Sequence, residues 1–179
     1  MFERTLEYIG LQYTKFIFRK EKDVQQEMTN FISRSRTALI ILPVDYDDAL
    51  AAGAAFKALK KKFEHLEITI LTEGIRATPL SEFPKSKVVR INQSHLNKFF
   101  LPRQKFLQRI LENNYDITID LNLDFILYAA YISRATGARI RIGFSHGAAD
   151  TFYNFQFNVD RNKPVKSIYD QIVQYFKMF

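Results

Sequence analysis

Short apolar runs alternate with amphipathic stretches along most of the chain. Runs rich in β-branched and aliphatic residues predict buried strands at 38–42, 67–71, 87–91, 116–120 and 138–144. Segments with a helical apolar period predict helices over 49–63, 102–113, 123–136 and 165–179. A further strand is expected within 152–159. Strand and helix therefore alternate regularly.

This alternation is typical of a parallel sheet with right-handed crossovers and helices on both faces. The sequence predicts an α/β fold: a single Rossmann-like domain over 37–179, preceded by an amphipathic helical extension over 1–36. In such sheets ligands bind beyond the carboxyl ends of the strands. The loops in that position are 43–48, 72–77, 120–124 and 145–150.

The N-terminal extension carries a regular apolar stripe. Its members recur at alternating four- and three-residue steps: Phe2, Leu6, Ile9, Tyr13 and Phe16, followed after a charged break by Val24, Met28 and Phe31. One or two amphipathic helices are predicted. We expect the stripe to pack on its own domain, with docking to a protein partner or to an anionic membrane surface as the alternative.

Composition narrows the possible chemistry. The chain has no cysteine, which excludes disulfides, thiolate metal sites and a cysteine nucleophile. No stretch has the length and apolarity of a signal peptide or membrane span, so we expect a cytoplasmic protein, with peripheral contact at the membrane as an alternative. The net charge is +7, but the basic residues are scattered. They predict solvated helix faces rather than a specific nucleic-acid site, with an anionic partner as the alternative.

The common cofactor motifs are absent. Neither a glycine-rich dinucleotide motif nor a P-loop follows the first predicted strand, and the three histidines lie far apart in the sequence. We therefore expect no cofactor and no histidine metal site.

Three acids follow the first predicted strand, where a helix is expected to begin: Asp45, Asp47 and Asp48. At least one should cap the helix by accepting hydrogen bonds from its free backbone amides. A carboxylate at this edge can also act as general base toward a hydroxyl, and three acids together can hold a divalent metal. These roles remain open.

Other candidates lie on neighbouring ligand-facing loops. Asp120, Asn122 and Asp124 are expected to cap the following helix, with a ligand contact as the alternative. Ser145 and His146 lie in a loop over the same edge, and a lone loop histidine is expected to be exposed. Arg139 and Arg141 alternate along a strand and are expected at a solvated or interface surface.

Three segments together carry a family resemblance: 39–63, 115–121 and 135–144, the last ending in Arg-Ile-Gly-Phe. In order and spacing, residues 37–179 resemble the N-terminal, acceptor-side domain of family 9 glycosyltransferases, the heptosyltransferases of lipopolysaccharide synthesis. The resemblance implies that Asp48 takes the place of the family's general base. It also places Asp47 where that family has glycine, and Leu42-Pro43-Val44 where it has a basic residue, a spacer and a serine.

The same resemblance implies a second domain, which holds the sugar-nucleotide donor in that family. The two domains of that family face each other across a cleft, and sugar transfer needs both of them. We therefore expect this domain to be inactive alone. The expected role is a binding or assembly module that docks on a protein partner through its N-terminal helix. The alternative is the acceptor-binding subunit of a split glycosyltransferase for a lipid-linked or envelope glycan, with the sugar nucleotide bound only if a partner supplies the donor domain.

The segment 45–50 also resembles the first metal-binding motif of DHH-family phosphoesterases, which place aspartates after the first strand. The Asp-His-His motif of that family does not occur in the sequence. A metal-dependent phosphoesterase is therefore the weakest alternative.

Overall fold

Six parallel strands form one sheet in the order β3-β2-β1-β4-β5-β6. A computed structural model of the chain describes residues 2–20, 23, 29–74 and 83–178. The strands are β1 (Thr37–Ile41), β2 (Glu67–Glu73), β3 (Ser86–Ile91), β4 (Ile117–Asp120), β5 (Ile140–Phe144) and β6 (Phe155–Phe157). The predicted α/β fold, with a parallel sheet flanked by helices and an N-terminal helix, is confirmed.

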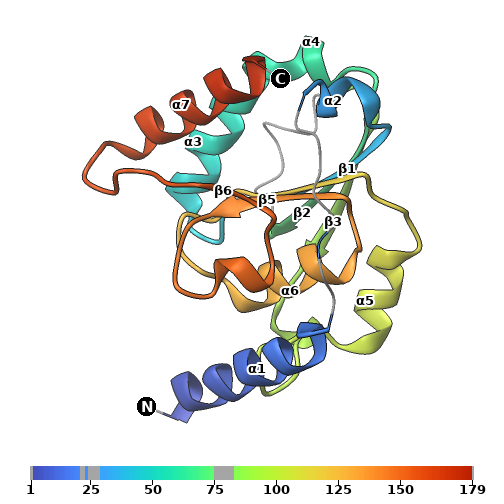
Figure 1. Ribbon diagram of the computed structural model, residues 1–179, viewed down its shortest axis with the longest axis vertical. Coiled ribbons are helices and arrows are strands. Elements are labelled where there is room, and N and C mark those ends of the chain that lie inside the picture. The colour runs from blue at the N-terminus through green and yellow to red at the C-terminus, as the bar shows by residue number, and fades with distance from the viewer. Residues whose placement is uncertain (1, 21–22, 24–28, 75–82, 179) are drawn as a thin grey trace.

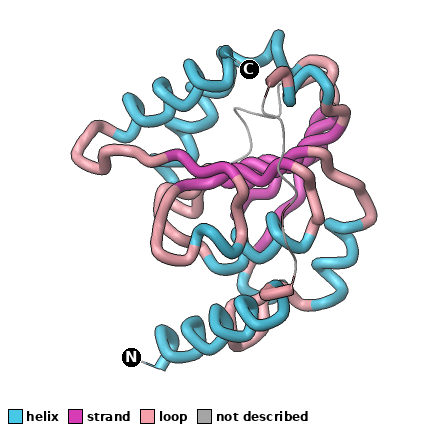
Figure 2. Tube along the Cα trace, in the orientation of Figure 1, coloured by secondary structure: helices cyan, strands magenta, loops and turns pink. Residues whose placement is uncertain are grey.

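Helices cover both faces of this sheet (Figures 1 and 2). The helices are α1 (Phe2–Phe18), α2 (Phe31–Arg34), α3 (Tyr46–Phe56), α4 (Lys60–Phe63), α5 (Gln104–Leu111), α6 (Leu127–Ala135) and α7 (Val165–Met178). Short 3₁₀ turns lie at η1 (Lys57–Leu59), η2 (Gln93–His95) and η3 (Ala149–Thr151). Figure 1 shows α3, α4 and α7 on one side of the sheet, α5 and α6 on the other, and α1 beyond α6.

Successive side chains of the central strand β1 belong alternately to two separate cores. In β1, Ala38 and Ile40 join the core beneath α3 and α7. Leu39 and Ile41 join the core beneath α5 and α6. A strand buried on both faces needs a nearly continuous apolar sequence, which is why this run predicts a central strand. Among the described residues, no helix is both long and apolar enough to cross a bilayer.

Several element boundaries differ from the predictions, and α6 begins at Leu127 rather than at 123. The helix expected over 49–63 begins earlier, at Tyr46, because Asp45 caps it, and it breaks into η1 and α4 after Phe56. The last predicted strand is reduced to Phe155–Phe157. In the extension, Val24 and Met28 lie outside the described residues, as do residues 75–77 of the loop after β2.

Within α1 the apolar stripe is largely exposed, so the expectation that it packs on its own domain is wrong there, whereas Phe31 at its end is 3% exposed and joins the core beneath α3 and α7. Exposed fractions are 77% for Phe2, 45% for Ile9, 56% for Tyr13 and 59% for Phe16. The opposite face of the helix is the docked one. There Gly10 is buried, and a Cβ at this position would lie 2.3 Å from the carbonyl oxygen of Phe99. Close backbone approach, rather than apolar burial of the stripe, therefore positions α1.

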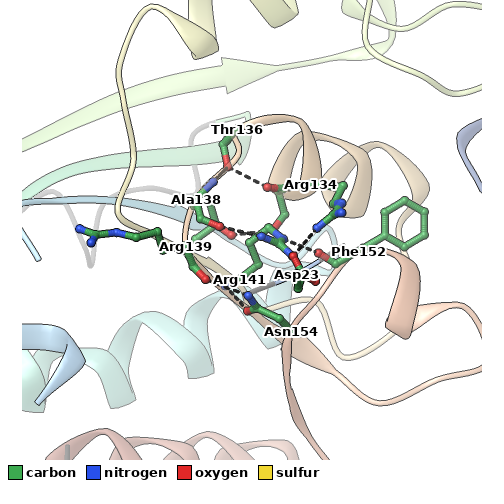
Figure 3. Close-up of polar contacts among 10 residues, drawn as sticks. Asp23, Arg134, Thr136, Ala138, Arg139, Arg141, Phe152 and Asn154 are labelled. Carbon is green, nitrogen blue, oxygen red and sulfur yellow. Dashed lines mark hydrogen bonds and ion pairs between the residues drawn. The ribbon is translucent and has the colours of Figure 1, made fainter. Parts of the chain in front are cut away.

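Two buried arginines bind the carboxylate of Asp23, which lies at the surface after α1 (Figure 3). Arg134 of α6 donates to Asp23 at 2.7 Å, and the guanidinium of Arg141 on β5 donates to the same carboxylate. Arg141 also donates to the carbonyl oxygens of Phe152 and Ala138. Both arginines are more than nine-tenths buried. The expectation that Arg141 edges a solvated surface is therefore wrong, whereas exposed Arg139 pairs with Asp116.

Burial alone would raise the pKa of Asp23, but its hydrogen bonds and charge interactions with Arg141 and Arg134 outweigh burial and lower it. The carboxylate therefore stays ionised where it compensates the buried guanidinium groups. Removing one partner from such a cluster leaves an uncompensated buried charge. Asp23 itself is thus tied to β5 and α6.

Substituting Gly10 with alanine should displace α1. Alanine favours a helix over glycine by about 1 kcal/mol, but its Cβ meets the backbone of Phe99 and overpacking costs about 1–3 kcal/mol. We expect faster amide hydrogen exchange across α1 in Gly10→Ala, measured by mass spectrometry. The control is Gly147→Ala, where a Cβ has no heavy atom within 4 Å. Unchanged exchange in Gly10→Ala would contradict this docking.

Candidate functional site

The candidate site lies where the strand order reverses. β1 and β4 are adjacent, with Ile41 opposite Asp120, although two strands separate them in sequence. The chain leaves β1 toward one side of the sheet and β4 toward the other. Such a switch point leaves a crevice beyond the carboxyl ends of the two strands. The loops after β1 and β4 form its walls.

Asp45 ends the first loop and begins α3. Its carboxylate accepts a hydrogen bond from the Asp48 amide at 3.0 Å, and its backbone is extended, as at a helix N-cap. The prediction that one of the three acids caps this helix is confirmed. Because the helix begins at Tyr46, Asp48 lies in its first turn, half-buried beside the crevice.

Asn122 joins the two loops. Its Oδ1 accepts from the Val44 amide at 2.8 Å, and its Nδ2 donates to Oδ1 of Asp120 at 2.7 Å. The expected capping of the following helix is wrong, because α6 has Ile126 at its N-cap and no side-chain capping bond. Asp120 and Asn122 instead hold the loop after β1 in a fixed position against the end of β4.

Asp120 is the buried centre of this arrangement. Its exposed fraction is 3%, and its Oδ2 accepts from the Tyr153 hydroxyl at 2.5 Å. Burial raises the pKa of Asp120 to about 6, although the hydrogen bonds from Tyr153 and Asn122 oppose this shift. The pKa of Tyr153 is also raised, by its own burial and by the charge of Asp120. The carboxylate supports the crevice from below and is not exposed in it.

Gly143 makes room for this contact. A Cβ at Gly143 would lie 2.6 Å from the nearest carbon of the Tyr153 ring. Any side chain on this residue of β5 would therefore push Tyr153 away from Asp120. The glycine of the Arg-Ile-Gly-Phe segment thus has a packing role beneath the crevice.

The crevice is an open hollow of about 470 Å³. Its lining combines acids, polar groups and apolar side chains: Pro43, Val44, Asp45, Tyr46, Asp48, Asn122, Leu123, Asp124 and Ile126. At its edge Arg161 donates to Asp124 at 2.6 Å. From α7, the buried Tyr169 hydroxyl donates to the Leu121 carbonyl at 2.8 Å and so fixes the start of the loop after β4.

The electrostatic field of the hollow is negative. Partial burial, and next the carboxylate of Asp45, raise the pKa of Asp48. Asp124 acts in the same direction, and only Arg161 opposes them among the charges that affect Asp48 most. A raised pKa keeps a carboxylate more basic, which suits both a hydrogen-bond acceptor and a general base.

The candidates predicted from sequence separate into two groups. Asp45, Asp48, Asn122 and Asp124 line the hollow together. Asp47 and Ser145 are exposed elsewhere on the surface. The expectation that His146 is exposed is wrong, because its ring is half-buried against those of Phe125 and Tyr153, with centroids 4.5 Å and 6.2 Å away. This burial lowers the pKa of His146.

Sequence reasoning missed Tyr46 and Tyr153. Tyr46 begins α3 and is 56% exposed in the hollow, a position that the cap signal at Asp45 could have suggested. Tyr153 is far from Asp120 in sequence, and no local pattern connects them.

The three acids do not form a metal site. Asp45 caps α3 while Asp47 points outward, and across residues 2–20, 23, 29–74 and 83–178 no group of three His, Asp or Glu side chains could hold a metal ion. This arrangement gives no support to the metal-dependent phosphoesterase alternative.

The fold and its switch-point crevice define a Rossmann-like domain with a carboxylate, that of Asp48, in the first turn of α3. A comparison with protein families matches residues 12–179 to DUF6913, a family of unknown function, and the chain belongs to that family. No curated protein matches the chain in a sequence search.

Heptosyltransferases and another family 9 glycosyltransferase are among the solved structures that resemble this chain. The E. coli heptosyltransferase WaaC with ADP aligns at a TM-score of 0.60 and 16% identity, over 78% of this chain and 46% of that one. A family 9 glycosyl transferase from Veillonella parvula DSM 2008 aligns at 0.59 and 15%, over 80% and 42%. The E. coli ADP-heptose lps heptosyltransferase II aligns at 0.58 and 16%, over 76% and 40%. The chain spans less than half the length of each, and the likeness establishes the fold.

The Asp120 carboxyl should make the free energy of unfolding depend on pH. Its pKa is about 6 in the folded chain against an ordinary 3.8, so the folded chain binds the proton more readily between these values. The free energy of unfolding should therefore fall by up to about 3 kcal/mol as pH rises through this window. Asp120→Asn should remove that fall.

Urea unfolding of wild type and Asp120→Asn from pH 3.5 to 7.5 measures this effect as the difference between the two curves. Other carboxyls contribute equally to both proteins and cancel. Asp170→Asn, at an exposed position of α7, is the control and should follow the wild type. Parallel curves for wild type and Asp120→Asn would show that Asp120 titrates normally.

Proposed function

We propose that this domain is a binding or assembly module that holds a hydroxyl-rich ligand of the saccharide type in the hollow beside Asp48, without transferring a sugar by itself. The observation that supports this most is the mixed lining of the hollow. Carboxylates such as Asp45 and Asp48 accept hydrogen bonds from hydroxyl groups, while Val44, Leu123 and Ile126 offer apolar contact. The exposed ring of Tyr46 provides a flat surface for the C–H face of a sugar.

The charge of the hollow favours a neutral ligand over a nucleotide. Among the described residues that line it, three side chains are acidic and none is basic. Arg161, the nearby cation at its edge, already pairs with Asp124. A departing diphosphate needs cations or oriented amides that stabilise its charge. A sugar acceptor therefore suits this wall better than a sugar-nucleotide donor.

A second candidate function is the acceptor-binding subunit of a split glycosyltransferase, acting on a lipid-linked or envelope glycan. The raised pKa of Asp48 favours it, because a general base becomes more effective as its pKa rises toward the working pH. The structural likeness to a heptosyltransferase is consistent with this function. The sequence resemblance to family 9 glycosyltransferases places the general base at Asp48. In this case a partner chain supplies the donor wall.

Titration calorimetry with glucose, galactose, N-acetylglucosamine and heptose, free and as disaccharides, tests the proposal. At least one saccharide should bind, and Asp48→Asn should weaken it about tenfold, because one charge-assisted hydrogen bond contributes about 1.5 kcal/mol. Asp170→Asn is the matched control and should bind as the wild type does. No heat from any saccharide, or equal affinity in Asp48→Asn, would refute the proposal.

Incubation of the same saccharides with ADP-heptose or UDP-glucose, followed by mass spectrometry, separates the two candidates. The binding-module function predicts no transfer by this chain alone. Transfer that appears only with a co-purified partner, and that Asp48→Asn abolishes, identifies the split enzyme.

A further inference from the structure

We propose that the exposed stripe of α1 is a self-association surface, on which α1 of a second copy of this chain packs antiparallel about a twofold axis. Its members within α1 are Phe2, Ile9, Tyr13 and Phe16, which are exposed, and Leu6, which is half-buried. This surface lies on α1, beyond α6, and its use does not depend on a ligand in the hollow.

The spacing of the stripe matches a helix-pairing seam. Its alternating four- and three-residue steps average about 3.5 residues, which is the period of the a and d positions in a coiled coil. The flanking exposed positions Thr5 and Gln12 are polar. A strict a/d seam of this kind is narrower than the apolar face with which a helix covers a sheet. A second helix can cover a seam of this width.

α1 cannot bury this seam on its own domain. The opposite face already packs on the domain. Gly10 lies against the backbone of Phe99, and the exposed fraction of Thr14 is 0%. Farther along, the ring of Phe18 lies against Tyr131 of α6, with centroids 5.6 Å apart. The helix is therefore already ordered and oriented, so pairing costs little conformational entropy.

The charges on α1 are self-complementary in an antiparallel pair. The first half of the helix carries Glu3, Arg4 and Glu7, two acids against one base, while Lys15 and, just beyond the helix, Arg19 and Lys20 make its end basic. Antiparallel pairing brings the acidic half of each copy beside the basic half of the other, and it also opposes the two helix dipoles. An amphipathic helix that binds anionic lipid is instead basic along its polar face. The acidic first half thus favours a second copy over a membrane.

Sedimentation velocity from 1 to 200 μM tests this inference on the full chain. The wild type should form a dimer with concentration, and Ile9→Glu should remain monomeric, because it places a charge in the centre of the seam. The control is Tyr8→Glu, since Tyr8 is 61% exposed but lies off the seam, and this variant should dimerise normally. A wild type that is monomeric throughout, or a dimer that persists in Ile9→Glu, would overturn the proposal.

Charge reversal tests the antiparallel orientation. Glu3→Lys with Glu7→Lys should weaken the dimer at least tenfold, and adding Lys15→Glu with Arg19→Glu should restore it, because the two halves are again opposite in sign. Failure of the four-residue variant to recover would contradict antiparallel pairing. Flotation with phosphatidylserine vesicles completes the experiment. A chain that is monomeric in solution and binds these vesicles through Ile9 would assign the stripe to a membrane.

Discussion

The buried carboxyl of Asp120 connects the segments on which the candidate site depends. It accepts hydrogen bonds from Asn122, which in turn holds the amide of Val44, and from Tyr153, which follows β5. The end of β4, the loop after β1 and the segment before β6 are thereby fixed to one group. A carboxyl with so little exposure is stable only when its lone pairs are satisfied, so displacing any one of these segments is costly. The hollow above it is a rigid surface for this reason.

This rigidity matters because the hollow is shallow and open. An open site gains affinity when its polar groups are already oriented before the ligand arrives. The cap at Asp45 orients the first turn of α3, and Asn122 orients the facing loop. Asp48 is then held at the switch point by the geometry of the first turn of α3. Its position belongs to the fold, and its binding role is what we propose.

Local patterns predicted most of the fold. The apolar runs and the periodic segments between them identify the sheet and its helices, and the acid cluster identifies the cap at the start of α3. What the sequence could not show are contacts between distant residues. Tyr153 meets Asp120 only after the sheet assembles, and Asp23 meets Arg141 across 118 positions. Gly10 explains why the apolar stripe of α1 faces outward, yet its close approach to Phe99 has no signal in the pattern around it.

The central claim is that a saccharide binds beside Asp48 on the surface fixed by Asp120. Backbone amide NMR of the wild-type chain, recorded during a titration with the saccharides, tests it most directly because it locates the ligand. The account predicts that the amide signals of Val44, Asp48 and Asn122 shift together and saturably. Shifts confined to another region, such as the groove lined by Ser94 and Arg109, would contradict it.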